Sequence, residues 1–263
     1  MALRVIVTRP AAQARGWIER LRARGIDAVA LPLLEISAAA DTGAMTDAWH
    51  SLDRFALAMF VSPNAVTHFF AARPAGAAWP EDLRAAATGP GTVDALVAAG
   101  VPRALCVAPV APPFDSTALW DRLRDEDWSS RAVLVVRGDG GREEFARALA
   151  GAGGTVRWVT AYRRSAPQWS DHERSLCEAA LAAPDEHLWL LSSGEALGHL
   201  VALAPGAQWG ASQAIASHAR IAEKARALGF GRVTEVPPTL DAVVAVVADH
   251  ERPQGRFVQS SSP

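Results

Sequence analysis

The sequence is poor in several residue types that mark common classes of protein. Its 263 residues include only 2 cysteines, Cys106 and Cys177, which form no CxxC motif. Two isolated cysteines favour a reduced cytosolic compartment. No apolar run approaches the roughly 18 residues that cross a membrane, and no cleavable signal precedes the first expected strand. We therefore expect a cytoplasmic protein without a membrane partner.

A surplus of charge of one sign is also missing. The 26 basic and 28 acidic residues leave a formal net charge of -2 at pH 7. So small a charge creates no field that attracts nucleic acid or an anionic membrane, and any bound anion must be held by local groups. A hydrophobic content of 50% is enough for two buried cores. We expect a two-domain globular protein with no nucleic-acid partner.

The motifs of nucleotide and metal chemistry are absent as well. Glu143 occupies the place of the third glycine in a GxGxxG fingerprint that would start at Gly138. The single lysine of the chain, Lys224, is not part of a GK[ST] phosphate loop. Leu176 stands where an HExxH motif starting at His172 needs its second histidine. We therefore expect neither a metal nor a dissociable cofactor.

A repeated unit of strand, small or polar turn and helix fills most of the sequence. Residues 132–164 show it most completely. Val133 to Val136 is a short apolar strand, Gly138 to Gly141 allows a sharp turn, and Phe145 begins the apolar face of a helix. The strand that follows contains the only tyrosine of the chain, Tyr162. This segment therefore combines a complete structural unit with polar groups at the ends of its strands.

Further strands of the same kind are expected along the chain. They lie at Arg4 to Val7, Ala28 to Leu34, Phe55 to Val61, Ala85 to Thr88, Leu105 to Ala108, Leu188 to Leu191, Ala214 to Ser217 and Val233 to Val236. Strands that alternate with helices form parallel sheets with right-handed crossovers, so the predicted fold class is α/β. Ligands of such sheets bind beyond the carboxyl ends of the strands, where the small and polar turns of this sequence lie.

The distribution of strands predicts how the domains are divided. The middle of the chain has a full set of strands, whereas the parts before and after it are each incomplete. We expect residues 1–37 and 166–250 to form one discontinuous domain, residues 38–165 to form the second, and residues 251–263 to be a disordered tail. Crossovers near Ser37 and Ser165 would join the domains, with the active site in the cleft between them.

A series of short motifs has the order and spacing of a known family. The series is Thr8-Arg9-Pro10, Pro32-Leu33-Leu34-Glu35, Phe60-Val61-Ser62-Pro63-Asn64-Ala65-Val66, Gly89-Pro90-Gly91-Thr92, Asp115-Ser116, Arg137-Gly138, Gly141-Arg142-Glu143, Tyr162-Arg163-Arg164 and Ser192-Ser193. Each motif is a strand end with small residues, and the ordered set resembles uroporphyrinogen-III synthases. One segment departs from the family pattern, because Ser217 to Ile221 lacks the Gly-Pro-Gly-Thr character of its counterpart at Gly89.

The resemblance implies two flavodoxin-like α/β domains, the first discontinuous, joined by a two-segment linker. It also implies a cyclising lyase of tetrapyrrole and heme biosynthesis. Such an enzyme closes hydroxymethylbilane with inversion of the terminal pyrrole ring and loss of water. Because the activated intermediate is already reactive, holding it in the right orientation can supply much of the rate enhancement. We expect a monomer that acts without a cofactor.

The site residues follow from the strand ends and from the resemblance. Tyr162 is expected to be catalytic, because a phenol keeps its proton at neutral pH and can assist a departing hydroxyl. Helix N-termini and arginines bind carboxylates, of which the substrate of the family has eight. The expected substrate-binding residues are Thr8, Arg9, Ser62, Pro63, Asn64, Gly89, Gly91, Thr92, Arg137, Gly138, Gly140, Arg142, Ser192, Ser193 and His218.

Structural roles remain open for the same residues. The serines and Asn64 are typical helix caps, the arginines are also typical of a solvated surface, and Tyr162 is typical of a core aromatic with a satisfied hydroxyl. Among the histidines only His218, at a strand-to-helix turn, is expected to be functional. A two-lobed small-molecule binding protein without catalysis would share the crossovers and the cleft. A flavodoxin-like signalling domain would explain only one block and would need a phosphate-acceptor cluster or flavin loop that the sequence lacks.

The missing motifs generate a first prediction. Extensive chelation and desalting of the protein should leave its formation of the inverted product isomer from hydroxymethylbilane unchanged, because no residues for a metal or a cofactor are recognised. The measurement is the yield of each product isomer before and after the treatment. Activity that is lost on chelation and restored by one particular metal ion would contradict the prediction.

Overall fold

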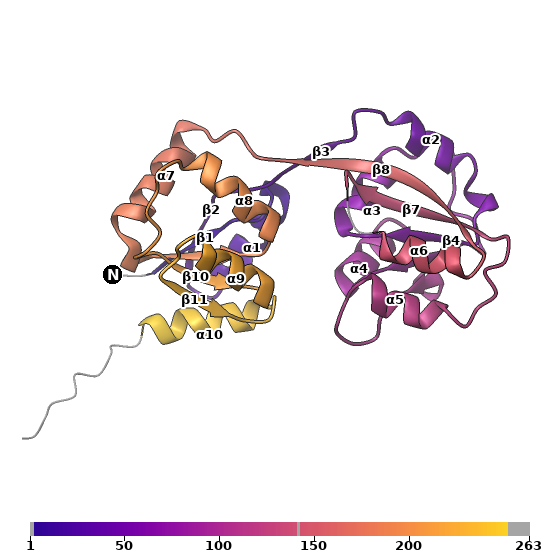
Figure 1. The fold of residues 1–263 in the computed structure, drawn as a ribbon. Helices are drawn as coiled ribbons and strands as arrows, with labels where there is room; N and C mark the ends of the chain where they lie inside the picture. Colours follow the sequence, from indigo (N-terminus) through magenta and orange to yellow (C-terminus); the bar gives the residue numbers. More distant parts are fainter. Residues whose placement is uncertain (1–2, 141–142, 252–263) are drawn as a thin grey trace, which may run out of the picture. The chain divides into compact units, whose positions relative to one another are not determined.

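The structure is a computed structural model, and it describes residues 3–140 and 143–251. The chain forms two compact units, one of Met1–Glu35 with Ser165–Pro263 and the other of Ile36–Arg164. Each unit contains one sheet (Figure 1). Of the tail expected from the sequence, residues 252–263 lie outside the described part of the chain, as does Arg142. Within the described residues, no helix has the length and apolar character that crossing a membrane requires.

The sheet of the first unit has five strands in the order β11-β10-β9-β1-β2. The strands are β1 (Arg4–Val7), β2 (Asp27–Ala30), β9 (His187–Leu191), β10 (Gln213–Ala216) and β11 (Arg232–Glu235). Their pairings are parallel. Numbered within the unit, the order is 2-1-3-4-5, that of flavodoxin-like folds. The direction of winding therefore reverses between β1 and β9.

Helices bury both faces of this sheet. The helices are α1 (Ala11–Arg22), α7 (Asp171–Ala182), α8 (Gly194–Leu203), α9 (Ala219–Ala227) and α10 (Leu240–Glu251). Ala14, Trp17 and Leu21 of α1 pack with residues of α10 on one face of the sheet. Figure 1 shows α9 beside β10 and β11. The central strands β1, β9 and β10 are apolar after their first residue because both of their faces are covered.

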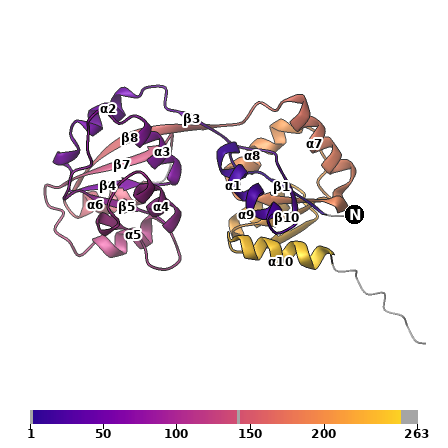
Figure 2. The same cartoon turned by 180° about the vertical axis from the view of Figure 1, so that it is seen from behind.

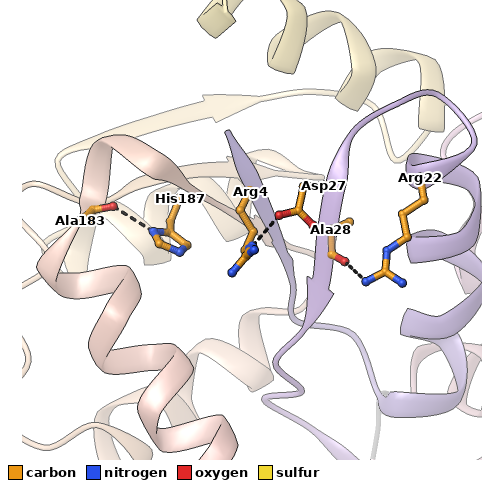
Figure 3. Close-up of polar contacts among 6 residues, drawn as sticks. All are labelled: Arg4, Arg22, Asp27, Ala28, Ala183 and His187. Carbon is orange, nitrogen blue, oxygen red and sulfur yellow. Dashed lines mark hydrogen bonds and ion pairs between the residues drawn. The ribbon is translucent and has the colours of Figure 1, made fainter. Parts of the chain in front are cut away.

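Polar contacts hold the amino-terminal edge of this sheet (Figure 3). Arg4 and Asp27, the paired first residues of β1 and β2, form an ion pair of 2.6 Å. Nδ1 of His187, the first residue of β9, lies 2.9 Å from the carbonyl oxygen of Ala183. Both partners of the ion pair are nearly half exposed, so the pair contributes at most about 1 kcal/mol. The ligand-binding edge of a parallel sheet is the opposite, carboxyl-terminal one.

The sheet of the second unit has six strands in the order β3-β8-β7-β4-β5-β6. The strands are β3 (Glu35–Ala38), β4 (Leu57–Phe60), β5 (Arg84–Ala87), β6 (Cys106–Val107), β7 (Ala132–Gly138) and β8 (Thr155–Ser165). The pairings from β8 through β6 are parallel. The winding of this sheet reverses between β4 and β7, because β5 and β6 follow on one side of β4 whereas β7 and β8 follow on the other.

Two apolar layers enclose this second sheet. The layer that contains Phe60 and Phe69 is formed with α2 (Gly43–Trp49), α3 (Pro63–Ala71) and α4 (Pro90–Ala98). The layer that contains Trp128 is formed with α5 (Ser116–Leu123) and α6 (Glu144–Gly151). Figure 2 shows the same arrangement from behind. Asp115 caps α5 by accepting the backbone N–H of Ala118 at 2.9 Å.

Two elements of the second unit, β3 and α2, have no counterpart among the elements expected from the sequence. The crossover expected near Ser37 contains β3, which pairs with β8, and the backbone N–H of Ala39 donates to the carbonyl oxygen of Ala161 at 3.3 Å. A short and mostly exposed strand has no alternation of apolar residues that a sequence pattern can detect. The strand expected over Ala28 to Leu34 is shorter in the structure, where β2 ends at Ala30, although the N–H groups of Leu31 and Leu33 still donate to the carbonyl oxygens of Val7 and Thr8.

The two units generate a prediction about independent folding. A fragment of residues 36–164 should unfold cooperatively on heating, because it contains a complete sheet with a core on each face. A fragment of residues 1–35 should show no transition, because it contains β1 and β2 but lacks β9, the other neighbour of β1. Circular dichroism during thermal melting tests both fragments. A fragment 36–164 without a cooperative transition would contradict the prediction.

Candidate active site

The site residues expected from the sequence lie at the carboxyl ends of the strands in both units. Thr8, Arg9, Ser192 and Ser193 follow β1 and β9, the two strands between which the first sheet reverses. In the second sheet the corresponding strands are β4 and β7, which lead into Ser62 to Asn64 and into the turn that contains Gly140. Such reversal points are the usual ligand sites of doubly wound sheets. Each unit therefore presents its own candidate site edge.

In the first unit, several of these side chains have structural partners. Thr8 is 2% exposed, and its hydroxyl donates to the carbonyl oxygen of Leu190 at 2.7 Å, which ties β1 to β9. Ser193 caps α8 by accepting the N–H of Ala196 at 3.2 Å. His218 caps α9, with Nδ1 accepting the N–H of Arg220 at 3.2 Å. The structure thus confirms that Ser193 is a helix cap. Ligand binding by Thr8, Ser193 and His218 stays a prediction.

Arg9 is the charged group of the first unit's site edge. Its guanidinium carbon lies 4.8 Å from the centroid of the Trp17 ring, and that of Arg20 lies 5.1 Å from the same ring. Nε of Arg9 is buried without a hydrogen-bond partner among the described residues. Burial and the charge of Arg20 lower the pKa of Arg9 from its usual value. Arg9 thus keeps an unused donor, although cation–π contact offsets part of the cost of its burial.

In the second unit, the expected residues begin two helices. Ser62 caps α3 by accepting the N–H of Ala65 at 3.2 Å, and Pro63 occupies the first turn. Gly89 precedes α4, whose first turn contains Gly91 and the buried Thr92. Free N–H groups at the start of a helix favour bound anions. The structure therefore gives Ser62 a capping role that is compatible with ligand binding.

A shift in strand pairing determines which face of the sheet Tyr162 occupies. Arg137 of β7 pairs with Thr160 of β8, but the next residue, Gly138, pairs with Tyr162, which leaves Ala161 as an extra residue. Such a bulge breaks the alternation of side chains along a strand. Tyr162 consequently packs in the same layer as Ala161, on the side of α3. Without the bulge Tyr162 would point to the opposite face, the side of α5 and α6.

The Tyr162 side chain is fixed by close contacts at this position. Its hydroxyl lies 3.1 Å from Oγ of Ser62, and either oxygen can be the donor. Its ring occupies the space that a side chain on Gly138 would fill, since a Cβ atom there would lie 2.7 Å from Cε2 and Cζ of the ring. The backbone is held as well, because the N–H of Asp139 donates to the carbonyl oxygen of Tyr162 at 3.0 Å. Glycine is therefore required at position 138.

A pocket of about 210 Å³ opens at this edge of the second sheet. Of the residues expected from the sequence, Arg137, Gly138, Gly140 and Tyr162 line it. Arg137 lies on the side of α5 and α6, with its guanidinium carbon 3.9 Å from the centroid of the Trp158 ring. Its Nε and Nη1 are buried and have no hydrogen-bond partner among the described residues. The pocket thus brings together a phenol, a cation with unused donors and a glycine turn.

Other residues of the pocket were not included in the expected set. They are Thr88, Phe114, Asp115, Ser116, Trp158 and Arg164, together with apolar residues of the core. Asp115-Ser116 and Arg164 belong to the family motifs, and that membership was the signal that could have identified them. The guanidinium of Arg164 donates to the carbonyl oxygen of Asp139 at 3.0 Å, so it also fixes the turn after β7. Trp158 gave no signal, because an aromatic residue within a strand is most often part of a core.

Nucleophilic and metal chemistry find little support in the described residues. They contain no group of three or more histidine, cysteine or acidic side chains placed to hold a metal ion. Burial, with a smaller contribution from Glu178, raises the pKa of Cys177 to about 11. Burial also raises the pKa of Cys106, against the opposing charge of Arg103. Both thiols are therefore protonated near neutral pH and are poor nucleophiles.

The family of the chain is established by comparison with known proteins. The family model described as uroporphyrinogen-III synthase HemD matches residues 16–245. The chain belongs to the uroporphyrinogen-III synthase family. The uroporphyrinogen-III synthase of Salmonella typhimurium is 27% identical over 209 residues, which are 78% of this chain and 80% of that protein. Uroporphyrinogen-III synthases are cyclising lyases of porphyrin and heme biosynthesis, so the family expected from the short motifs is confirmed.

Solved structures of uroporphyrinogen-III synthases share the fold. A mutant enzyme from Thermus thermophilus aligns with a TM-score of 0.61 at 17% identity, over 95% of this chain and 98% of that one. The enzyme from Helicobacter pylori aligns with a TM-score of 0.51 at 13% identity, over 95% of this chain and 99% of that one. At these identities the likeness concerns the fold alone. It confirms the predicted α/β class with parallel sheets.

The close approach of Tyr162 to Gly138 generates a prediction. In Gly138→Ala the new methyl group meets the phenol ring at 2.7 Å, so the ring must move away from Ser62. Overpacking of this kind lowers the free energy of unfolding by about 1–3 kcal/mol. Because Tyr162 is the only tyrosine, selective ¹³C labelling of tyrosine gives one set of ring signals, and these should shift.

Gly16→Ala is the matched control for this substitution. Gly16 lies within α1, and a Cβ atom there would have no other atom within 4 Å. The tyrosine signals of Gly16→Ala should coincide with those of the unsubstituted protein, while helix propensity raises its stability by up to about 1 kcal/mol. Unchanged tyrosine signals in Gly138→Ala would contradict the packing described for Tyr162.

Proposed function

We propose that this chain converts hydroxymethylbilane to uroporphyrinogen III, inverting the terminal pyrrole ring and releasing water as the macrocycle closes. Membership of the uroporphyrinogen-III synthase family supports the reaction class. The position of the Tyr162 hydroxyl supports the assignment of roles to particular residues. This hydroxyl lies within hydrogen-bonding distance of Ser62, beside a pocket at the strand ends. The proposal assigns Tyr162 the catalytic role in this reaction.

The proposed role of Tyr162 is to assist the departing hydroxyl of the substrate. When the C–O bond of the hydroxymethyl group breaks, the hydroxyl needs a proton to leave as water, and a phenol that is protonated at neutral pH can donate it. Ser62 lies within hydrogen-bonding distance of the Tyr162 oxygen and can orient its lone pairs and proton. As the terminal ring inverts, the former hydroxymethyl carbon bonds to the pyrrole carbon that carried the methylene bridge, and the bond from that carbon to the bridge breaks. The bridge then bonds to the free α-carbon of the same ring. This α-carbon loses its proton, which restores the phenol of Tyr162 and balances the release of water. Orientation of the flexible chain supplies the remaining rate enhancement.

The proposed role of Arg137 is to bind a substrate carboxylate in the pocket. A buried guanidinium with two nitrogens that lack partners among the described residues is an incomplete interaction, and a carboxylate would complete it. Stacking on Trp158 holds the guanidinium plane in a defined orientation. The remaining expected residues are proposed to bind other carboxylates or the substrate chain. They are Thr8, Arg9, Ser62, Pro63, Asn64, Gly89, Gly91, Thr92, Gly138, Gly140, Arg142, Ser192, Ser193 and His218.

We also propose that the protein is a monomer, that it is located in the cytoplasm and that it acts without a cofactor. A two-lobed binding protein without catalysis is the alternative. Incubation with freshly generated hydroxymethylbilane, followed by separation of the product isomers, distinguishes the two. The proposed enzyme forms the inverted isomer in excess over the spontaneous reaction. A protein that binds the substrate but leaves the isomer ratio at its spontaneous value would be the binding protein.

The assignment of Tyr162 generates a prediction. Tyr162→Phe removes one oxygen and keeps the buried ring, so the melting temperature should change little while the rate of enzymatic closure falls. The decrease should be of the order of the 10²–10⁴-fold attributed to a positioned acid, and smaller where water replaces the phenol oxygen. Single-turnover kinetics and thermal melts measure both effects. Unchanged kinetics together with a lowered melting temperature would show that Tyr162 is only a packed aromatic.

The assignment of Arg137 generates a separate prediction. Arg137→Gln should raise KM for hydroxymethylbilane by about 10- to 100-fold with a smaller change in kcat, because a charged hydrogen bond to the substrate is lost. Arg147→Gln is the matched control, since Arg147 is an exposed arginine of α6 in the same unit. Steady-state kinetics of both variants provide the comparison. Equal KM values for Arg137→Gln, Arg147→Gln and the unsubstituted enzyme would rule out carboxylate binding by Arg137.

A further inference from the structure

His68 contacts Tyr162, although nothing in the sequence marked it as part of the site. It lies on α3, the helix that Ser62 caps. The centroids of the His68 and Tyr162 rings are 5.9 Å apart, with an angle of 24° between the ring planes, which is an offset stacked arrangement. The same helix thus contacts both ends of the tyrosine side chain, through Ser62 at the hydroxyl and through His68 at the ring.

We propose that His68 is a positioning residue for ring closure, which holds the phenol of Tyr162 in the orientation that directs its hydroxyl to Ser62. This inference rests on the proposed function, because it assigns His68 an effect through Tyr162 and no contact with the substrate. The chemistry of the imidazole as an acid, base or metal ligand is not required. What matters is a flat ring at this position of α3.

The three contacts of the Tyr162 side chain constrain different motions. The hydrogen bond to Ser62 fixes the distance of the oxygen from α3 but permits the ring to turn about its long axis. Gly138 has no side chain and so leaves space for the Tyr162 ring, since a Cβ atom at this position would lie 2.7 Å from Cε2 and Cζ of the ring. Stacking against His68 opposes the rotation that remains, because a turned ring would lose its offset contact. All three contacts together define one orientation of the phenol, which is the requirement for directed proton donation.

The surroundings of His68 agree with a role confined to ring contact. Its side chain is half-buried, and within the described residues neither ring nitrogen has a hydrogen bond. Burial lowers the pKa of His68 from its ordinary value, so the imidazole is uncharged near neutral pH. An uncharged ring beside the phenol leaves the phenol proton in place for donation. The adjacent Phe69 is fully buried and supplies the core packing of this part of α3.

The test compares three substitutions of His68 in the full-length enzyme. His68→Ala and His68→Gln remove the ring, whereas His68→Phe keeps a flat ring of similar reach. We expect kcat for closure of hydroxymethylbilane to fall about 3- to 10-fold in the first two variants, the range of one ring-stacking contact, and to stay near normal in His68→Phe. KM should change by less than about twofold in all three, because His68 does not bind substrate. His172→Ala, at an exposed histidine of α7, should behave like the unsubstituted enzyme.

A double-mutant cycle shows whether the effect passes through Tyr162. In the Tyr162→Phe background, His68→Ala should cause no further decrease in kcat, since the hydroxyl that His68 positions is gone. A normal kcat in both His68→Ala and His68→Gln would overturn the inference and leave the proposed function intact. So would an equal decrease in the presence and absence of the Tyr162 hydroxyl, or a failure of His68→Phe to restore the rate. An unsubstituted enzyme that forms no inverted isomer would instead overturn the proposed function, and this inference with it.

Discussion

The geometry of the candidate site in the second unit depends on a one-residue shift in the pairing of β7 with β8. This shift leaves Ala161 as an extra residue and turns Tyr162 to the face covered by α3. On the other face the phenol would be far from the N-terminus of α3 and from the Ser62 hydroxyl that caps it. The bulge lies where β7 ends, and at such positions bulges commonly re-aim a functional side chain. The polar function of the site thus originates in a backbone irregularity of an otherwise regular sheet.

The contacts around the bulge support one another. Because Gly138 has no side chain, the ring of Tyr162 can lie directly against its backbone. Asp139 makes hydrogen bonds to the backbone carbonyl oxygen of Tyr162 and to the backbone N–H of Arg164, so the turn after β7 is joined to the segment of β8 that contains Tyr162. Arg137 emerges on the opposite face, where Trp158 orients it. A phenol and a guanidinium therefore reach the same pocket from the two faces of one sheet.

The sequence predicted the features that depend on residue type and periodicity. The apolar strand runs, the small and polar turns and the capping residue Ser62 are of this kind, and they place the candidate site at the strand ends. The bulge is not of this kind, because a shift of pairing depends on hydrogen bonds between strands and leaves no mark in the order of residues. The contact of His68 was missed for the same reason. A half-buried histidine on a helix reveals its neighbour only once the register of β8 is known.

We propose that the hydroxyl of Tyr162 lies where the substrate reacts, and nuclear magnetic resonance of this residue can test the proposal. Since the chain has a single tyrosine, a protein labelled with ¹³C at tyrosine Cζ gives one signal from the carbon that bears this hydroxyl. We expect this signal to shift saturably when uroporphyrinogen III is added under reducing conditions, in parallel with quenching of tryptophan fluorescence. A signal that stays unchanged while the fluorescence shows saturated binding would contradict it.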